Sequence, residues 1–139
     1  MASVPETRSR FALRGLAGGW RGRLVLAVAF GAAVGLVVGD PAARLAADPE
    51  LAWLMRGMAL VKALMIAVGV RVLWWRFGLE IEPMRARAYV AALALMAFAA
   101  ALAWQLSYLP ILSVAFHGAL LSLGVLAWRD GGVALPRRR

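Results

Sequence analysis

Apolar residues gather into four long runs along the chain, with polar and charged residues between and beyond them. The runs cover approximately residues 24–40, 51–75, 88–109 and 110–128. Each comes close to, or exceeds, the ~20 apolar residues that a helix needs to cross the ~30 Å hydrocarbon core of a bilayer. An isolated strand would leave its backbone groups unpaired in lipid, whereas a helix pairs them within itself. The pattern therefore predicts four transmembrane helices.

The ends of the runs carry residues that often mark helix and membrane boundaries. The fourth run begins at Pro110, and proline is well tolerated in the first turn of a helix. All six tryptophans fall near the ends of the runs, as in the aromatic belts of membrane proteins. The segment after the first run offers no clean small-x-small cleavage site, so we expect a retained span and not a cleaved signal peptide.

The overall composition agrees with a membrane protein. Of the 139 residues, 63% are hydrophobic, whereas roughly half are apolar in an ordinary soluble domain. The length allows one domain. The sequence therefore predicts an all-α integral membrane protein, with a bundle of four transmembrane helices over residues 24–128. A basic segment, residues 1–23, precedes this bundle, and a basic tail, residues 129–139, follows it.

The arginines predict how the bundle is oriented. Five precede the first run, three lie between the second and third runs, and four follow the fourth run. All twelve fall on one side of the predicted membrane, whereas Arg44 alone lies in the loops of the other side. Cytoplasmic loops of membrane proteins carry such an excess of basic residues. Both termini are therefore expected in the cytoplasm.

The formal net charge of +9 has a membrane explanation. The arginines cluster at the ends of apolar runs and not along one face, so we expect them to contact anionic lipid headgroups. Nucleic-acid binding is not expected on this pattern. The preference for arginine over lysine and the abundant alanine are typical of a GC-rich bacterial genome. The predicted location is therefore the bacterial inner membrane.

Small residues recur at a spacing of four in three of the runs, which places them on one face of each helix. This small-xxx-small pattern allows another helix to approach closely in lipid. We expect these faces to pack within the bundle, and the alternative is a surface for a partner subunit. The residues are Gly31, Gly35 and Gly39 in the first run, Ala59, Ala63 and Ala67 in the second, and Gly118 and Ser122 in the fourth.

Lys62 is the anomaly of the sequence. It is the only lysine, and it lies roughly 17 Å into the second run at 1.5 Å per residue. A lysine at the membrane centre costs about 2.5–3.5 kcal/mol, and none of the four runs contains Asp or Glu. Three accounts remain open. The amine is uncharged, or it bonds to carbonyls, Ser113, Gln105 or His117 inside the bundle, or its anionic partner comes from another chain or a ligand.

Besides Lys62, the second run carries Arg56 and Arg71, and the fourth run carries His117. Arg56 is roughly 8 Å from the start of its run, so its side chain can reach the interface. His117 lies roughly 10 Å down the fourth run and is expected to be a hydrogen-bonded packing residue. Together with Lys62, Gln105 and Ser113, Arg56 and His117 are the candidate contacts for a partner or an anion.

The residues of enzyme active sites are missing from the sequence. It contains no cysteine and one histidine, and no nucleophile triad, paired carboxylates, phosphate loop or metal-ligand cluster is recognisable. We therefore expect no catalytic residues, no metal and no cofactor.

Three functions fit this set of features. The first is a non-catalytic accessory or assembly subunit of a larger membrane complex, of respiratory or photosynthetic type. The alternative is a small oligomeric transporter or channel that attracts an anionic solute with Lys62. Arg56 and Lys62 lie about 120° apart around their helix, so they do not simply face one lumen. A further alternative is a quinone- or lipid-binding helper.

Overall fold

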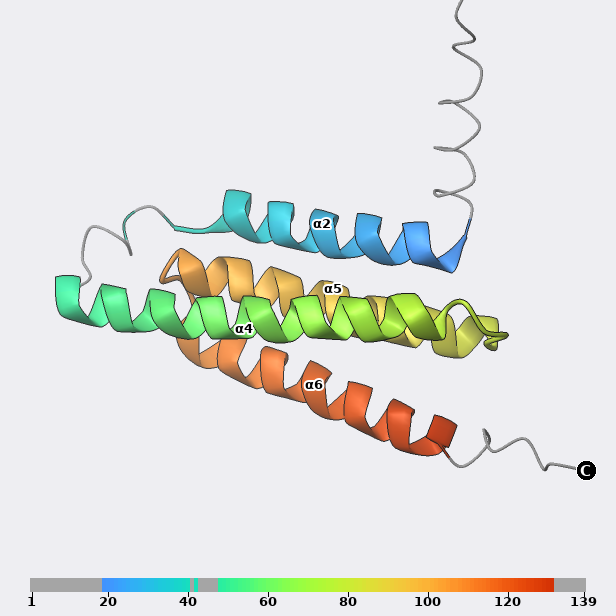
Figure 1. Cartoon of the computed structure of the whole chain (residues 1–139). Helices are drawn as coiled ribbons and strands as arrows, with labels where there is room; N and C mark the ends of the chain where they lie inside the picture. Colours follow the sequence, from blue (N-terminus) through green and yellow to red (C-terminus); the bar gives the residue numbers. More distant parts are fainter. Residues whose placement is uncertain (1–18, 41, 43–47, 132–139) are drawn as a thin grey trace, which may run out of the picture.

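The computed structural model describes residues 19–40, 42 and 48–131, and these residues form four α-helices and no β-strand (Figure 1). The helices are α2 (Trp20–Val38), α4 (Pro49–Arg76), α5 (Pro83–Trp104) and α6 (Leu109–Gly131). All four are long and apolar enough to cross a membrane. The prediction of an all-α chain with four candidate spans is confirmed. Most of the predicted basic segment 1–23 and most of the basic tail 129–139 lie outside the described residues.

Proline and a capping carboxylate explain where two helices begin. Pro49 and Pro83 stand in the first turns of α4 and α5, where a backbone N–H would have no partner within the helix. Asp48 precedes α4, and its side chain accepts a hydrogen bond of 2.8 Å from the backbone N–H of Glu50. Both starts lie ahead of the apolar runs, because the first turn of a helix tolerates polar residues.

The bounds predicted for the last two spans need correction. The third helix is Pro83–Trp104 and not 88–109, because the chain turns at residues 105–108. Leu106 and Tyr108 adopt positive φ angles of 60° and 54° in this turn, a conformation that non-glycine residues rarely adopt. Their apolar character hides the turn from a reading of hydropathy alone. The fourth helix continues to Gly131, past the predicted end at 128.

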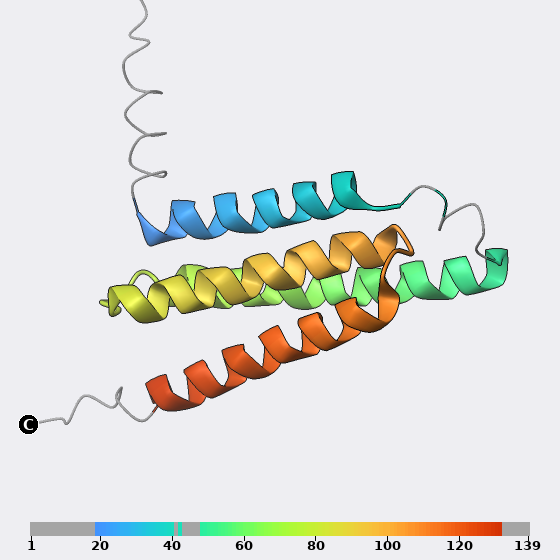
Figure 2. The same ribbon diagram turned by 180° about the vertical axis from the view of Figure 1, so that it is seen from behind.

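Helix α5 lies at the centre of the fold, and α2, α4 and α6 each pack against it. Figure 2 shows α5 between α2 and α6, with α4 behind it. In the most apolar 18-residue stretch of α5, 56% of the residues are buried, whereas 11–17% are buried in the corresponding stretches of the other three helices. Much of the buried surface of α5 is alanine, whose small side chain lets several helices approach one axis.

The glycine face of α2 packs directly against the backbone of α5. A Cβ atom added to Gly31 would lie 2.5 Å from the carbonyl oxygen of Ala94, and one added to Gly35 would lie 2.6 Å from that of Phe98. At Gly39 the nearest atoms belong to the flexible side chain of Gln105. Glycine is therefore needed at the first two positions because α5 leaves no room for a side chain.

The small residues of α4 divide between two faces. Ala59 is buried, whereas Ala63 and Ala67 are exposed. The buried positions of α4 recur every seven residues, as is typical of helices that pack along one seam. They are Ala52, Ala59, Ile66 and Leu73.

The small residues of α6 do not contact another helix in the described part of the chain. A Cβ added to Gly118 would meet nothing within 4 Å. Ser122 is exposed, and its hydroxyl donates to the carbonyl oxygen of Gly118 in the same helix, at 2.8 Å. The use of these two residues, and of Ala63 and Ala67, as a surface for a partner stays a prediction.

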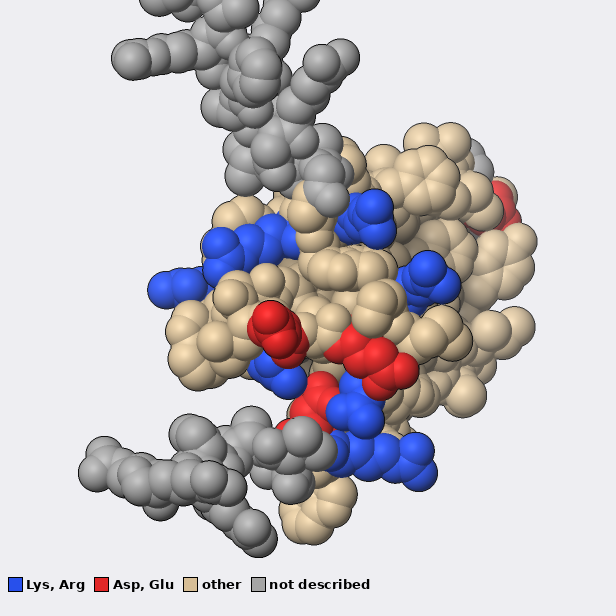
Figure 3. All heavy atoms as spheres, turned by 90° about the vertical axis from the view of Figure 1, so that its right-hand side faces the viewer, with Lys and Arg blue, Asp and Glu red and all other residues tan. Residues whose placement is uncertain are grey.

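One end of the bundle is rich in arginine. It contains the start of α2, the end of α4, the start of α5 and the end of α6 (Figure 1). Figure 3 looks onto this arginine-rich end and shows basic side chains gathered there, with a few acidic side chains between them. Two contacts from Arg21 join α2 to α4: its Nε donates to the carbonyl oxygen of Trp74 at 3.0 Å, and its guanidinium lies 5.5 Å from the Trp74 ring centroid.

Candidate functional site

Lys62 lies half-buried in the middle of α4 and faces α6. Its Nζ is 5.1 Å from the ring centroid of Phe116. Across residues 19–40, 42 and 48–131, Lys62 forms no ion pair and no side-chain hydrogen bond. A cation–π contact contributes about 2 kcal/mol when it is desolvated, which is less than the cost of about 2.5–3.5 kcal/mol for a central lysine. For a lysine held at the centre of a bilayer, the aromatic ring would therefore offset only part of that cost.

The three side chains expected to bond Lys62 have other partners. The Nε2 group of Gln105 donates to the carbonyl oxygen of Leu36 on α2 at 3.0 Å. On α6, Nδ1 of His117 lies 2.6 Å from the carbonyl oxygen of Ser113 and 3.5 Å from its hydroxyl oxygen. The structure does not bring Lys62 to Gln105, Ser113 or His117.

Arg56 lies on α4 toward α5 and not toward Lys62. Its guanidinium carbon is 5.9 Å from the ring centroid of Trp104, the last residue of α5. The Nε atom of Arg56 is buried and has no hydrogen-bond partner among the residues that the structure describes. Because Lys62 contacts α6 instead, the two cations face different helices. Their separation argues against a single anion path lined by both.

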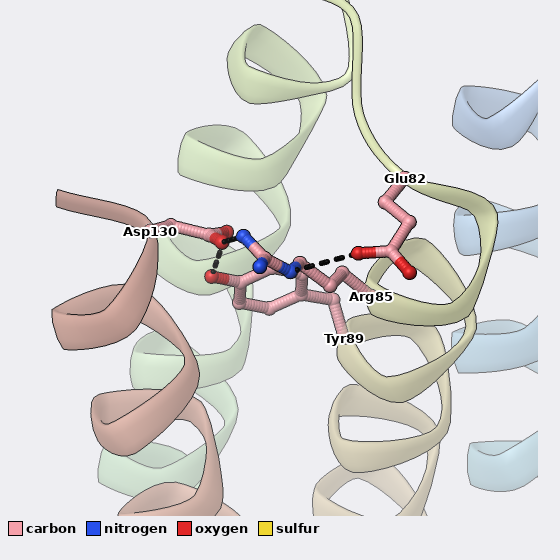
Figure 4. A network of polar contacts seen from close by, with 4 residues as sticks. All are labelled: Glu82, Arg85, Tyr89 and Asp130. Atoms are coloured by element: carbon pink, nitrogen blue, oxygen red, sulfur yellow. Dashed lines mark hydrogen bonds and ion pairs between the residues drawn. The ribbon is translucent and has the colours of Figure 1, made fainter. Parts of the chain in front are cut away.

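A second polar cluster lies at the arginine-rich end and joins α5 to α6 (Figure 4). Asp130 accepts hydrogen bonds of 2.7 Å from Nη1 of Arg85 and from the hydroxyl of Tyr89. Asp130 and Tyr89 are only 7% and 4% exposed. Glu82 forms a weaker, more exposed ion pair with Arg85, at 3.1 Å. The cluster gives a buried carboxylate two donors and thereby fixes the end of α6 against α5.

Sequence reasoning missed this cluster. By sequence alone, Asp130 belongs to the basic tail after the fourth apolar run, and Arg85 is one of the three arginines between the second and third runs. A signal was present, since Asp130 is the only acidic residue after Glu82. Arg85 and Tyr89 also share a helix face at a spacing of four. Their meeting with Asp130 depends on the continuation of α6 to Gly131, which hydropathy does not reveal.

The described residues contain no group of three or more His, Asp or Glu side chains that could hold a metal ion. The structure instead shows two basic side chains in apolar surroundings. Lys62 lies over an aromatic ring, and the Nε atom of Arg56 has no hydrogen-bond partner in the described residues.

In comparisons with known proteins, no family model, no curated protein and no solved structure matches this chain.

Proposed function

We propose that this protein is a non-catalytic accessory or assembly subunit of a larger complex in the bacterial inner membrane, of respiratory or photosynthetic type. The observation that carries the proposal is the environment of Lys62, which lies in the middle of a candidate span. In the described chain its amine lies over the ring of Phe116 and has no acidic partner. Ionisable residues inside membranes usually pair with one another or with backbone carbonyls, or mark a functional contact. A carboxylate from a neighbouring subunit would complete the environment of Lys62.

Exposed apolar side chains do not by themselves support this proposal. Helices α4 and α6 expose many large apolar residues, but lipid tails cover such surfaces as well as a protein would. Only a polar feature distinguishes a partner from lipid. Lys62 supplies that feature.

The Lys62→Met variant tests the proposal. Methionine has a similar volume and no charge, so the lone chain should insert and fold as well as the wild type, or more stably. Recovery of co-purifying membrane proteins after gentle detergent extraction should fall, because the acid of the partner would be left unpaired in the membrane.

The matched control is Lys62→Arg, which keeps the charge and should retain more of the partner. Thermal stability of the purified chain is measured beside the recovery of partners for all three proteins. If Lys62→Met keeps its stability and every co-purifying protein, Lys62 has no role in assembly. A loss of stability without loss of partners would indicate a contact within the chain instead.

The predicted orientation has its own test. The chain has no cysteine, so single cysteines can be introduced without background labelling. We expect Ala42→Cys, beyond the end of α2, to react with a membrane-impermeant reagent in intact cells. Glu80→Cys, between α4 and α5, should react only after permeabilisation, because the arginine-rich end is predicted to be cytoplasmic. The reverse pattern would place both termini outside.

A further inference from the structure

An apolar groove runs between α2 and α4, and α5 forms its floor. Figure 1 looks onto this side of the bundle, with α5 visible between the two other helices. The groove has a volume of about 460 Å³, within the ~300–1,000 Å³ typical of ligand sites. Its lining is apolar throughout, with alanines from all three helices, such as Ala32, Ala63 and Ala97. Small side chains from each wall leave space that larger residues would fill.

The groove has a cation at one end. Ala59, Leu60 and Ala63 line the groove from α4, and Arg56 lies one turn before them on the same helix face. The guanidinium of Arg56 lies beside Trp104, which lines the groove at the end away from the arginine-rich end.

Arg56 lacks a partner for its Nε atom, which is buried with no acceptor in the part of the chain that the structure describes. A buried donor without an acceptor is unfavourable, and a guanidinium binds phosphate oxygens strongly. An anionic group at this end would therefore complete the contacts of Arg56.

The chemistry of the groove favours an amphiphilic lipid over a helix. Its lining is apolar throughout, which suits a hydrocarbon chain. The guanidinium of Arg56 beside Trp104 suits an anionic head group at one end of that chain. We propose that the groove binds one acyl chain of an anionic phospholipid, whose phosphate contacts Arg56 beside Trp104.

The test uses the full chain, purified in a neutral detergent, with added dioleoyl-phosphatidylglycerol or dioleoyl-phosphatidylcholine. We expect the anionic lipid to raise the thermal midpoint of the wild type more than the zwitterionic one. Native mass spectrometry should find phosphatidylglycerol retained on the protein. Arg56→Gln should weaken phosphatidylglycerol binding about tenfold or more, because a charge-assisted contact is lost. Arg71→Gln, an exposed change on the same helix, should behave as the wild type.

A second variant tests the acyl-chain part of the site. Ala63 is exposed at the groove wall, so Ala63→Phe should fill the groove without disturbing the core and should reduce the response to both lipids. The proposal is overturned if Arg56→Gln responds to phosphatidylglycerol as the wild type does. It is also overturned if Ala63→Phe loses a co-purifying protein but keeps its lipid response, since a helix would then occupy the groove. The lipid-response readouts use the lone chain and are independent of Lys62 and its partner.

Discussion

A Gly35→Leu variant is expected to lose the packing of α2 on α5, with a destabilisation of about 3 kcal/mol. The first added atom already has no room. A Cβ at this position would lie 2.6 Å from the carbonyl oxygen of Phe98 and 2.8 Å from the Cβ of Ala101. Both belong to the backbone or the first side-chain atom of α5, so neither can rotate away. The two helices must separate along the whole contact.

A graded series gives this prediction its sharpest form. Gly31→Ala and Gly35→Ala should both destabilise the protein, because each methyl group meets a backbone carbonyl of α5. Gly39→Ala should have a smaller effect, since the side chain of Gln105 can move. The free energy of unfolding is measured by titrating detergent micelles of the purified protein with sodium dodecyl sulfate.

The matched controls are Gly57→Leu and Gly118→Leu, where an added Cβ meets nothing within 4 Å in the described structure. Both should be neutral or slightly stabilising, because leucine is a better helix former than glycine. Equal effects at Gly35 and Gly57 would show that α2 does not pack on α5 through its glycine face.

Asp130→Asn should destabilise the protein by about 2 kcal/mol, the typical loss for a hydrogen bond to a charged group. The carboxylate of Asp130 is buried and accepts from Arg85 and Tyr89 at 2.7 Å each. An amide keeps one acceptor oxygen but presents an N–H₂ group to one of these two donors. The contact between the end of α6 and the start of α5 should weaken, with little change at α2.

Two further variants separate the charge from the hydrogen bonds. Glu82→Gln should change stability by less than about 0.5 kcal/mol, because its ion pair with Arg85 is exposed on both sides. Tyr89→Phe removes one donor to Asp130 and should cost about 1–2 kcal/mol. In a double-mutant cycle, Tyr89→Phe and Asp130→Asn should be less than additive. Additive effects would mean that the two side chains do not interact in the membrane protein.

The polar groups of this protein fall into two classes with different implications. At the arginine-rich end, Asp130, Arg85 and Tyr89 satisfy one another and stabilise the bundle. Inside the candidate span, Lys62 and Arg56 each face an aromatic ring, with no acid beside them in the described residues. The first class helps to hold the end of α6 against α5. The second class is where we place the contacts with other molecules, a partner's acid at Lys62 and a lipid phosphate at Arg56.

The number and type of the elements follow from local properties of the sequence. Four apolar runs predict four helices, because lipid offers backbone groups no other partner. The positions of prolines and polar residues refine the starts of α4 and α5. The glycine spacing in the first run identifies a face for close approach, and the structure places Gly31 and Gly35 against α5. The unusual placement of Lys62 is equally evident from the sequence, because its residue type and its distance from the start of the apolar run are both read directly from it.

The arrangement of the helices was decided only by the tertiary structure. The apolar residues of each helix are not concentrated on one side, so no amphipathic pattern distinguishes an inner face from an outer one. The central place of α5, the outward position of Ala67 and Gly118, and the neighbours of Lys62 and Arg56 therefore depend on packing between distant segments. Asp130 meets Arg85 across 45 residues of sequence. Such contacts depend on which surfaces fit together in three dimensions, and hydropathy along one dimension contains no measure of that fit.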